Sequence, residues 1–292
     1  MIELPEAVTL ARQLDTSVRG ERVTGVIAGG TPHKMAWFHD DPRAYPGLLG
    51  GTTLGPARQR GGYVEIDMDD ARLLVAEGVA LRLHAAGAPR PDKHQLLLEL
   101  AGGSALSASV QMYGGVWAFR AGTFDNAYYR AACTAPSPLT PAFDREHWHR
   151  LLAAPKAQKG SVKGLLATEQ RIPGLGNGVL QDILLAARLH PRRKVGSLND
   201  DERGALYDAI TSTLAQMAER GGRDTERDLY GRPGGYRTKL SRNTAGGPCA
   251  ACGSVIVKET YMGGAIYVCP GCQRDQKGAG GVHELANRLP MY

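Results

Sequence analysis

The sequence predicts an α+β protein of several domains: an N-terminal helix with an antiparallel β-sandwich, a C-terminal helical domain, and a small four-cysteine ribbon. Three observations support this prediction. Short runs rich in Val, Leu and Ile fill residues 22–120, helical patterns follow a proline-rich segment at 133–142, and two Cys-x-x-Cys pairs lie near the end. The chain of 292 residues also exceeds the ~100–200 residues of one typical domain.

The first helix is predicted over residues 5–18. Pro5 suits the first helical position, where a missing N–H costs nothing, and Glu6 suits the positive end of the helix dipole. Val8, Leu14 and Val18 belong to a broad apolar face. This pattern is typical of a helix that packs against a core.

The next hundred residues predict an antiparallel β-domain. Their apolar runs are short and are separated by glycines and charged turns. The segment 63–68, YVEIDM, alternates apolar and polar residues, as a half-buried strand does. Several such strands at short intervals indicate a sandwich or a barrel.

Helical patterns fill much of the second half, at 142–153, 161–170, 177–190 and 199–220. The last helix begins with acidic residues, which suit the helix dipole, and ends at two glycines. A basic, glycine-rich connector without periodicity follows it. We therefore expect an N-terminal domain at 1–135, a helical domain at 136–248, the ribbon at 249–274 and a polar tail at 275–292.

Four of the five cysteines have the spacing of a metal site. Cys249 and Cys252 form one Cys-x-x-Cys pair, and Cys269 and Cys272 form the other after sixteen intervening residues. Two such pairs are typical of a tetrahedral Zn²⁺ site, and four sulfur ligands leave no open position, so one structural zinc per chain is predicted. The alternative is two disulfides, which a reducing compartment disfavours. Cys133 is expected to be a small buried hydrophobe.

Charge is distributed unevenly along the chain. Residues 1–155 hold 15 Lys/Arg and 16 Asp/Glu, whereas residues 156–292 hold 20 and 13. The basic second half favours a polyanionic partner such as nucleic acid, although a basic surface without a partner is the alternative. No apolar run approaches the ~18 residues of a membrane helix, and the N-terminus does not resemble a secretory signal.

The segment IPGLGNG at 172–178 is a glycine-rich turn before an apolar helix. Its glycines allow close approach of the backbone, and Asn177 lies near a helix N-terminus, where N–H groups and the helix dipole attract an anion such as a DNA phosphate. Lys159 and Lys163 precede the turn and could flank the same backbone. The alternative is an ordinary turn with Asn177 as helix cap.

Together these motifs resemble the formamidopyrimidine-DNA glycosylase and endonuclease VIII family of base-excision repair. The matching segments are ELPE at 3–6, the turn and helix at 172–191, GRPGGY at 231–236 and the cysteine pairs ending in CPGCQ at 269–273. The resemblance implies a two-domain clamp: the helix and β-sandwich face a helix–two-turns–helix domain with its zinc ribbon. Damaged double-stranded DNA lies between them with the damaged base flipped out.

The resemblance also implies DNA-contacting residues. Asn177 and the ribbon loop would hold phosphates, His94 matches a DNA-contacting histidine, and Tyr113 matches an aromatic wedge beside the opposite base. Lys159 and Lys163 lie in the family's basic stretch. The same resemblance implies a monomer that works in the cytoplasm, associated with the nucleoid.

Several positions depart from the family pattern. The family's nucleophile is an N-terminal proline that forms an imine with the sugar, but Ile2 stands there, and the initiator Met is normally kept before so large a residue. The terminal amine therefore belongs to Met1, and a primary amine with pKa ~8 can still form an imine. Other family side chains are replaced as follows: the hairpin lysine by Gly62, the ribbon arginine by Gly264, and two intercalating residues by Gln111 and Gly87.

Glu3 and Glu6 are the candidate catalytic residues. A carboxylate at this place could orient water and stabilise positive charge at the sugar C1′, giving a glycosylase without strand-nicking lyase activity. Two alternatives remain: the acids only cap the first helix, and the protein is a catalytically inactive binder of DNA lesions. An RNA-binding zinc-ribbon protein is a third, from another class.

Overall fold

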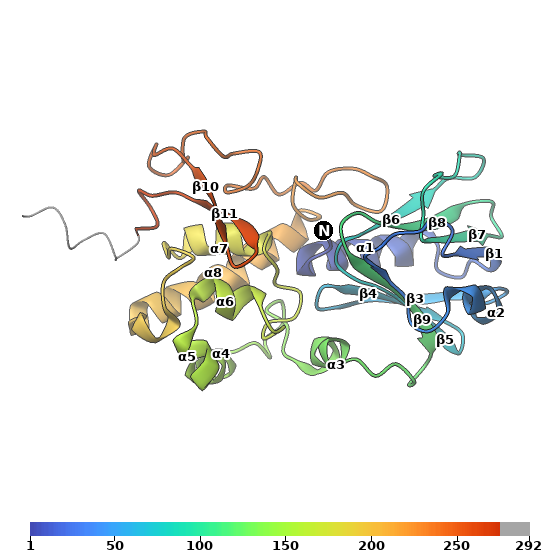
Figure 1. The fold of residues 1–292 in the computed structure, drawn as a ribbon, viewed down its shortest axis with the longest axis horizontal. Helices are drawn as coiled ribbons and strands as arrows, with labels where there is room; N and C mark the ends of the chain where they lie inside the picture. Colours follow the sequence, from blue (N-terminus) through green and yellow to red (C-terminus); the bar gives the residue numbers. More distant parts are fainter. Residues whose placement is uncertain (275–292) are drawn as a thin grey trace, which may run out of the picture.

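The structure is a computed structural model that describes residues 1–274. A β-rich half and a helical half lie side by side along the long axis of the molecule, and the N-terminus lies between them (Figure 1). The predicted tail at 275–292 lies outside the described residues. None of the described helices is both long and apolar enough to cross a membrane.

The helices predicted from the sequence are confirmed, with ends that differ by a few residues. The strongest boundary signal is at Asn199, whose side chain accepts from the Glu202 backbone N–H while Glu202 caps Asn199 in return. The described helices are α1 (Leu4–Ser17), α2 (Tyr45–Leu49), α3 (Ala127–Thr134), α4 (Arg145–Ala153), α5 (Pro155–Lys159), α6 (Val162–Ala167), α7 (Val179–Ala186), α8 (Asp200–Glu219), and the 3₁₀ turns η1 (Pro42–Ala44) and η2 (Val195–Ser197).

Two sheets form the predicted sandwich, and a hairpin forms the ribbon. One sheet has the order β1-β7-β8-β6, the other β2-β9-β5-β4-β3, and the ribbon pairs β10 with β11. Pairing is antiparallel except between β2 and β9. The described strands are β1 (Val23–Ala28), β2 (Ala36–Trp37), β3 (Leu54–Arg60), β4 (Tyr63–Met68), β5 (Ala71–Val75), β6 (Val79–His84), β7 (Leu96–Leu100), β8 (Ala105–Val110), β9 (Gly114–Arg120), β10 (Val257–Tyr261) and β11 (Gly264–Val268).

Each half has its own apolar core. The alternation in β4 places Val64, Ile66 and Met68 in the core of the β-rich half, to which α1 also contributes its apolar face. A second core joins α4 to α8 of the helical half around Trp148. Because α1 packs on β3 and β4 and also contacts α8, the first helix lies where the two halves meet.

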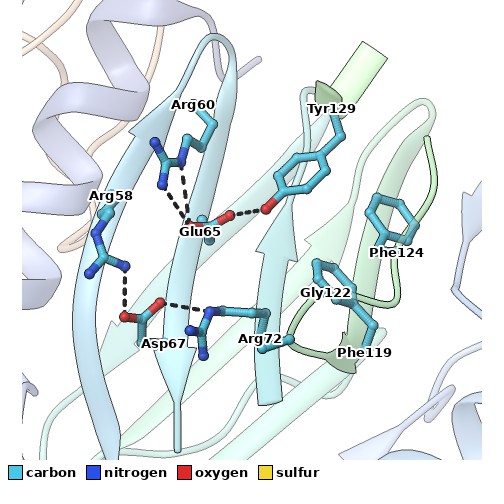
Figure 2. Close-up of a pocket in the computed structure, with 10 residues that line it drawn as sticks. Arg58, Arg60, Glu65, Asp67, Arg72, Phe119, Gly122, Phe124 and Tyr129 are labelled. Carbon is cyan, nitrogen blue, oxygen red and sulfur yellow. Dashed lines mark hydrogen bonds and ion pairs between the residues drawn. The ribbon is translucent and has the colours of Figure 1, made fainter. Parts of the chain in front are cut away.

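A short helix in the linker, α3, covers the outer face of the five-stranded sheet. Tyr129 donates to the buried Glu65 carboxylate, and Phe124 stacks on Phe119 with ring centroids 4.5 Å apart (Figure 2). The sequence analysis did not predict this helix. The prediction that Cys133 is buried is wrong: its side chain is exposed, because α3 packs against the sheet through Tyr129 and Ala132.

Candidate active site and metal centre

Met1 is held from three sides at the junction of the two halves. Its terminal amine forms an ion pair with Glu226, its carbonyl accepts from Arg223 Nη2 at 3.3 Å, and the Tyr113 hydroxyl lies 4.0 Å from its sulfur. The Ile2 side chain is buried in the core of the β-rich half. The start of the chain is therefore fixed, with its amine beside a carboxylate from the far end of the sequence.

Glu6 is buried and paired with an arginine. Arg223 donates to both carboxylate oxygens, from Nε at 3.0 Å and from Nη2 at 2.8 Å. The backbone N–H of Glu3 also donates to Glu6, at 3.1 Å, which is the capping contact expected at the start of α1. Burial alone would raise the pKa of Glu6, but the neighbouring Arg223 outweighs it and the pKa is lowered.

Glu3 reaches across to the helical half. Its two oxygens accept the backbone N–H groups of Gly178 and Val179, at 2.8 and 2.7 Å, at the start of α7. Arg223 Nη1 lies 3.5 Å away. Burial raises the pKa of Glu3, although Arg223 and the two N–H groups oppose that shift. The anion at this helix N-terminus is thus the Glu3 carboxylate, where the sequence suggested a DNA phosphate.

The glycine-rich turn contacts the tip of the β3–β4 hairpin backbone to backbone. The same turn is also bonded to the start of α1, where the N–H of Leu4 donates to the carbonyl of Gly174 at 2.8 Å. The contact with the hairpin is tight. A Cβ built on Gly174 would lie 2.4 Å from the carbonyl carbon of Gly61 and 2.5 Å from the Gly62 nitrogen. Gly174 has φ +83°, so glycine is required here both for its conformation and for this contact.

A cavity of about 320 Å³ lies beside Met1. It is bounded by the start of α1, by β6 and by the segment after α8. Glu6 lines it and Glu3 does not. The residues that line it are Met1, Ile2, Glu6, Leu10, Gly78, Val79, Ala80, Leu81, Arg82, Gln111, Met112, Thr225, Glu226, Arg227 and Arg242.

Sequence reasoning missed Arg223, Glu226 and Arg82. The first two lie in the segment that was predicted to be a connector, and Arg82 lies in a strand. The alternating charges of RDTERD at 223–228 are the one signal that could have drawn attention to that segment.

Asn177 and Lys163 converge on the ribbon hairpin. Asn177 Nδ2 donates to the Ala265 carbonyl at 2.9 Å, and Lys163 Nζ donates to the Tyr261 carbonyl at 2.5 Å. A Cβ on Gly264 would lie 3.4 Å from Lys163 Nζ and 3.5 Å from the Asn177 amide group. The lysine ammonium therefore lies close to Gly264, the position at which the resemblance led us to expect a ribbon arginine.

The other predicted DNA contacts lie apart from this pair. Tyr113 is beside Met1 and packs near Trp37, with ring centroids 5.9 Å apart. His94 Nδ1 bonds the Pro91 carbonyl at 2.9 Å, and its Nε2 is buried without a hydrogen-bond partner among residues 1–274. The side chain of Lys159 is exposed on α5. Their contacts with DNA stay predictions.

The four cysteines of the ribbon come together as the spacing predicts. Their sulfur atoms lie within 4.8 Å of one another, including a separation of 3.9 Å for Cys249–Cys272 and 3.3 Å for Cys252–Cys269. A tetrahedral zinc with Zn–S bonds of ~2.3 Å needs sulfur atoms about 3.8 Å apart. A Cβ on Gly271 would lie 2.9 Å from the Cys252 sulfur, so a larger residue at this position would push that sulfur away from the other three. The four residues fit a metal ion.

The comparison with known protein sequences finds relatives that cover nearly the whole chain. A formamidopyrimidine-DNA glycosylase of Symbiobacterium thermophilum is 30% identical over 279 residues, covering 94% of this chain and 89% of that protein. One of Methylococcus capsulatus is 31% identical over 281 residues, covering 94% and 100%. No protein-family model matches the chain.

Solved structures show the same fold. The MutM (Fpg) protein of Thermus thermophilus superimposes with a TM-score of 0.77 at 26% identity, covering 93% of this chain and 98% of that one. The Lactococcus lactis Fpg in complex with DNA containing an abasic site gives a TM-score of 0.78 at 24% identity, covering 94% and 100%.

Proposed function

Because the chain belongs to the formamidopyrimidine-DNA glycosylase family, we propose that it binds damaged double-stranded DNA and excises a modified base by hydrolysing the N-glycosidic bond, without the strand-nicking lyase step. The names of its relatives support the glycosylase activity, and the solved complexes of Fpg with DNA support the partner. The proline amine of the family is replaced by the terminal amine of Met1, which is held in an ion pair with Glu226, and an ammonium is not a nucleophile.

One observation carries this proposal: the Met1 amine and the Glu226 carboxylate form an ion pair at a cavity. Hydrolysis of a glycosidic bond needs a base that takes a proton from the attacking water and an acid that gives a proton to the departing group. Glu226 would take a proton from a water molecule whose oxygen bonds to C1′. As the bond from C1′ to the base nitrogen breaks, the Met1 ammonium would give a proton to the departing base.

Glu3 and Glu6 have positioning roles in this proposal. Both are bound by Arg223, which also holds the Met1 carbonyl. Their carboxylates therefore act on the reaction by fixing the terminal amine beside Glu226. This differs from the direct catalytic role that the sequence suggested, because Glu3 does not line the cavity and Glu6 is paired.

The ribbon would hold one structural zinc through Cys249, Cys252, Cys269 and Cys272. When bound, the metal would fix the hairpin against which Asn177 and Lys163 donate their hydrogen bonds. The Asn177 amide and the buried Lys163 ammonium would thereby support the hairpin, which could then contact a phosphate of the DNA backbone. Four sulfur ligands leave the metal no open position for catalysis.

The activity is tested with duplexes that carry oxidised, alkylated or abasic sites. We expect release of free base, detected by mass spectrometry, with a strand that stays intact until alkaline treatment. The variant Glu226→Gln should lose at least about a hundredfold in rate, as expected when a general base is removed. The control is Glu146→Gln, whose ion pair with Arg150 is on the surface of α4. A borohydride-trapped protein–DNA adduct would contradict the hydrolytic route.

The second candidate function is a catalytically inactive binder of DNA lesions. The engagement of Glu3 and Glu6 with Arg223 favours it, because neither predicted catalytic acid is free. This function is supported if no base is released from any duplex while lesion-bearing DNA still binds more tightly than intact DNA.

A further inference from the structure

Two cavities of the described residues are each lined by three arginines, and they differ in how those arginines are paired. The first, about 300 Å³, lies on the outer face of the five-stranded sheet (Figure 2). Arg58 and Arg72 both contact Asp67, at 2.6 and 2.9 Å, and Arg60 contacts Glu65 at 3.3 Å. Each arginine of this first cavity is paired with a carboxylate, so none of the three is free to bind a ligand.

The cavity beside Met1 is different, because none of its three arginines forms an ion pair with a carboxylate within residues 1–274. Within the same residues, each guanidinium donates a hydrogen bond only to one backbone carbonyl. The pairs are Arg82 with Leu81 at 2.6 Å, Arg227 with Gly231 at 2.8 Å, and Arg242 with Thr225 at 3.4 Å. Their remaining donors are available to a ligand in the cavity.

The carboxylates nearest to these arginines are already engaged. Glu226 binds the Met1 amine, and Glu6 binds Arg223. Asp228 accepts from the Gln13 side chain at 2.9 Å and from two backbone N–H groups of its own loop. The partners of Asp228 are all uncharged, and its negative charge favours the cationic form of Arg82. Three cations thus line one cavity, and positive charge stays in excess because the described residues provide only this one nearby carboxylate without a cation partner.

Arg82 is the most enclosed of the three arginines. It extends from β6 and is half-buried, and burial lowers its pKa, yet an arginine stays charged at neutral pH. A guanidinium removed from water is costly unless an anion or hydrogen-bond acceptor compensates it. The cavity is therefore suited to a ligand that brings its own negative charge.

We infer that this cavity recognises an anionic, oxygen-rich nucleobase, such as a base that carries a ring carboxylate. The planar fork of Arg82 matches the two oxygens of a carboxylate, and Arg227 and Arg242 would neutralise it from the loop side. A neutral base would leave the guanidiniums without an anion. The inference rests on the proposed function, because only a base flipped out of the duplex can enter the cavity.

The test compares duplexes that differ at one base only. One carries 5-carboxycytosine, the second 5-methylcytosine and the third cytosine, and affinity is measured by fluorescence anisotropy at one fixed salt concentration because phosphate contacts depend on salt. We expect the full-length protein to bind the carboxylate-bearing duplex about tenfold more tightly, the size of one charge-assisted hydrogen bond. Arg82→Met should lose this preference and keep its affinity for the cytosine duplex.

The control variant is Arg58→Met, from the first cavity, which should keep the preference. If Arg82→Met does not fold, the double variant of the two exposed loop residues, Arg227→Met with Arg242→Met, should also lose the preference. Equal binding of the three duplexes by the wild type would overturn the inference. An equal loss of affinity for all three in Arg82→Met would also overturn it, because it would assign the guanidinium to a backbone phosphate.

Base release from the lesion panel is measured separately. Release without a preference for the carboxylate refutes the inference and supports the proposed function. A preference in binding without release of any base supports the inference and refutes the proposed excision.

Discussion

Arg223 and Glu6 form a buried, doubly hydrogen-bonded ion pair although they are 217 positions apart in the chain. Their side chains are 2% and 6% exposed. The same guanidinium lies 3.5 Å from Glu3 and donates to the carbonyl of Met1. One arginine thus connects the first helix, the start of α7 through Glu3, and the terminal residue whose amine faces the cavity.

Replacing Arg223 with methionine should strongly destabilise the fold. The substitution would leave the Glu3 and Glu6 carboxylates buried without a cation, and breaking a buried ion pair in this way costs about 3–5 kcal/mol. Urea unfolding at pH 7 measures the change. The matched control is Arg145→Met, whose pair with Asp208 is exposed and should contribute below ~1 kcal/mol. Equal stability of the two variants would argue against this account.

The Glu6–Arg223 pair should also make stability depend on pH. Because the pKa of Glu6 is lowered in the folded protein, its carboxylate stabilises the fold above its ordinary pKa of 4.5, and this contribution is lost as the pH falls through the lower folded value. The free energy of unfolding should therefore differ most between wild type and Glu6→Gln at neutral pH. Their difference should shrink below pH 4.5; a difference that stays constant down to pH 3 would be incompatible with this assignment.

Elements with strong local signals could be predicted from the sequence. Helix α8 has acidic residues and a cap at its start and two glycines at its end, and β4 alternates regularly. Helix α3 could not be predicted in this way, because none of its eight residues is fully buried and it packs through only a few side chains. The exposure of Cys133 was missed for the same reason, since it depends on which side of α3 meets the sheet.

The residues of the site could likewise be predicted only where they lie close together in the sequence. The cysteine cluster depends on spacing within 24 residues, so the sequence alone indicated it. Glu226 and Arg223 acquire their roles only by meeting Met1 and Glu6 more than 200 positions away. The segment that carries them has no periodicity from which such a contact could be inferred. Gly178 shows the same dependence: a Cβ there would overlap Arg223 Nη1, so its need for glycine comes from the fold.

Removing the metal should unfold the ribbon and weaken DNA binding. Metal analysis of the purified protein should give about one zinc per chain, and Cys252→Ser should lower it to near zero because four thiolates are needed for a closed site. DNA affinity should fall in this variant, since the hairpin that contacts Asn177 and Lys163 loses its support. The control is Cys133→Ser, an exposed cysteine outside the cluster. Full zinc content in Cys252→Ser would contradict the four-sulfur assignment.

The contact between the glycine turn and the hairpin tip can be tested with two glycines in the same backbone conformation. Gly174 has φ +83° and Gly122 has φ +84°, so alanine costs about 1–2 kcal/mol of backbone strain at either position. A Cβ on Gly174 would also lie 2.4 Å from the Gly61 carbonyl carbon, whereas a Cβ on Gly122 meets nothing within 4 Å. Gly174→Ala must therefore push the hairpin away from the turn, and overpacking of this kind adds about 1–3 kcal/mol.

Urea unfolding should show a larger loss of stability for Gly174→Ala than for Gly122→Ala. Base release should fall only in Gly174→Ala, because the displaced turn leads into the N–H groups that hold Glu3. Equal losses in the two variants would mean that the turn and the hairpin do not touch in solution.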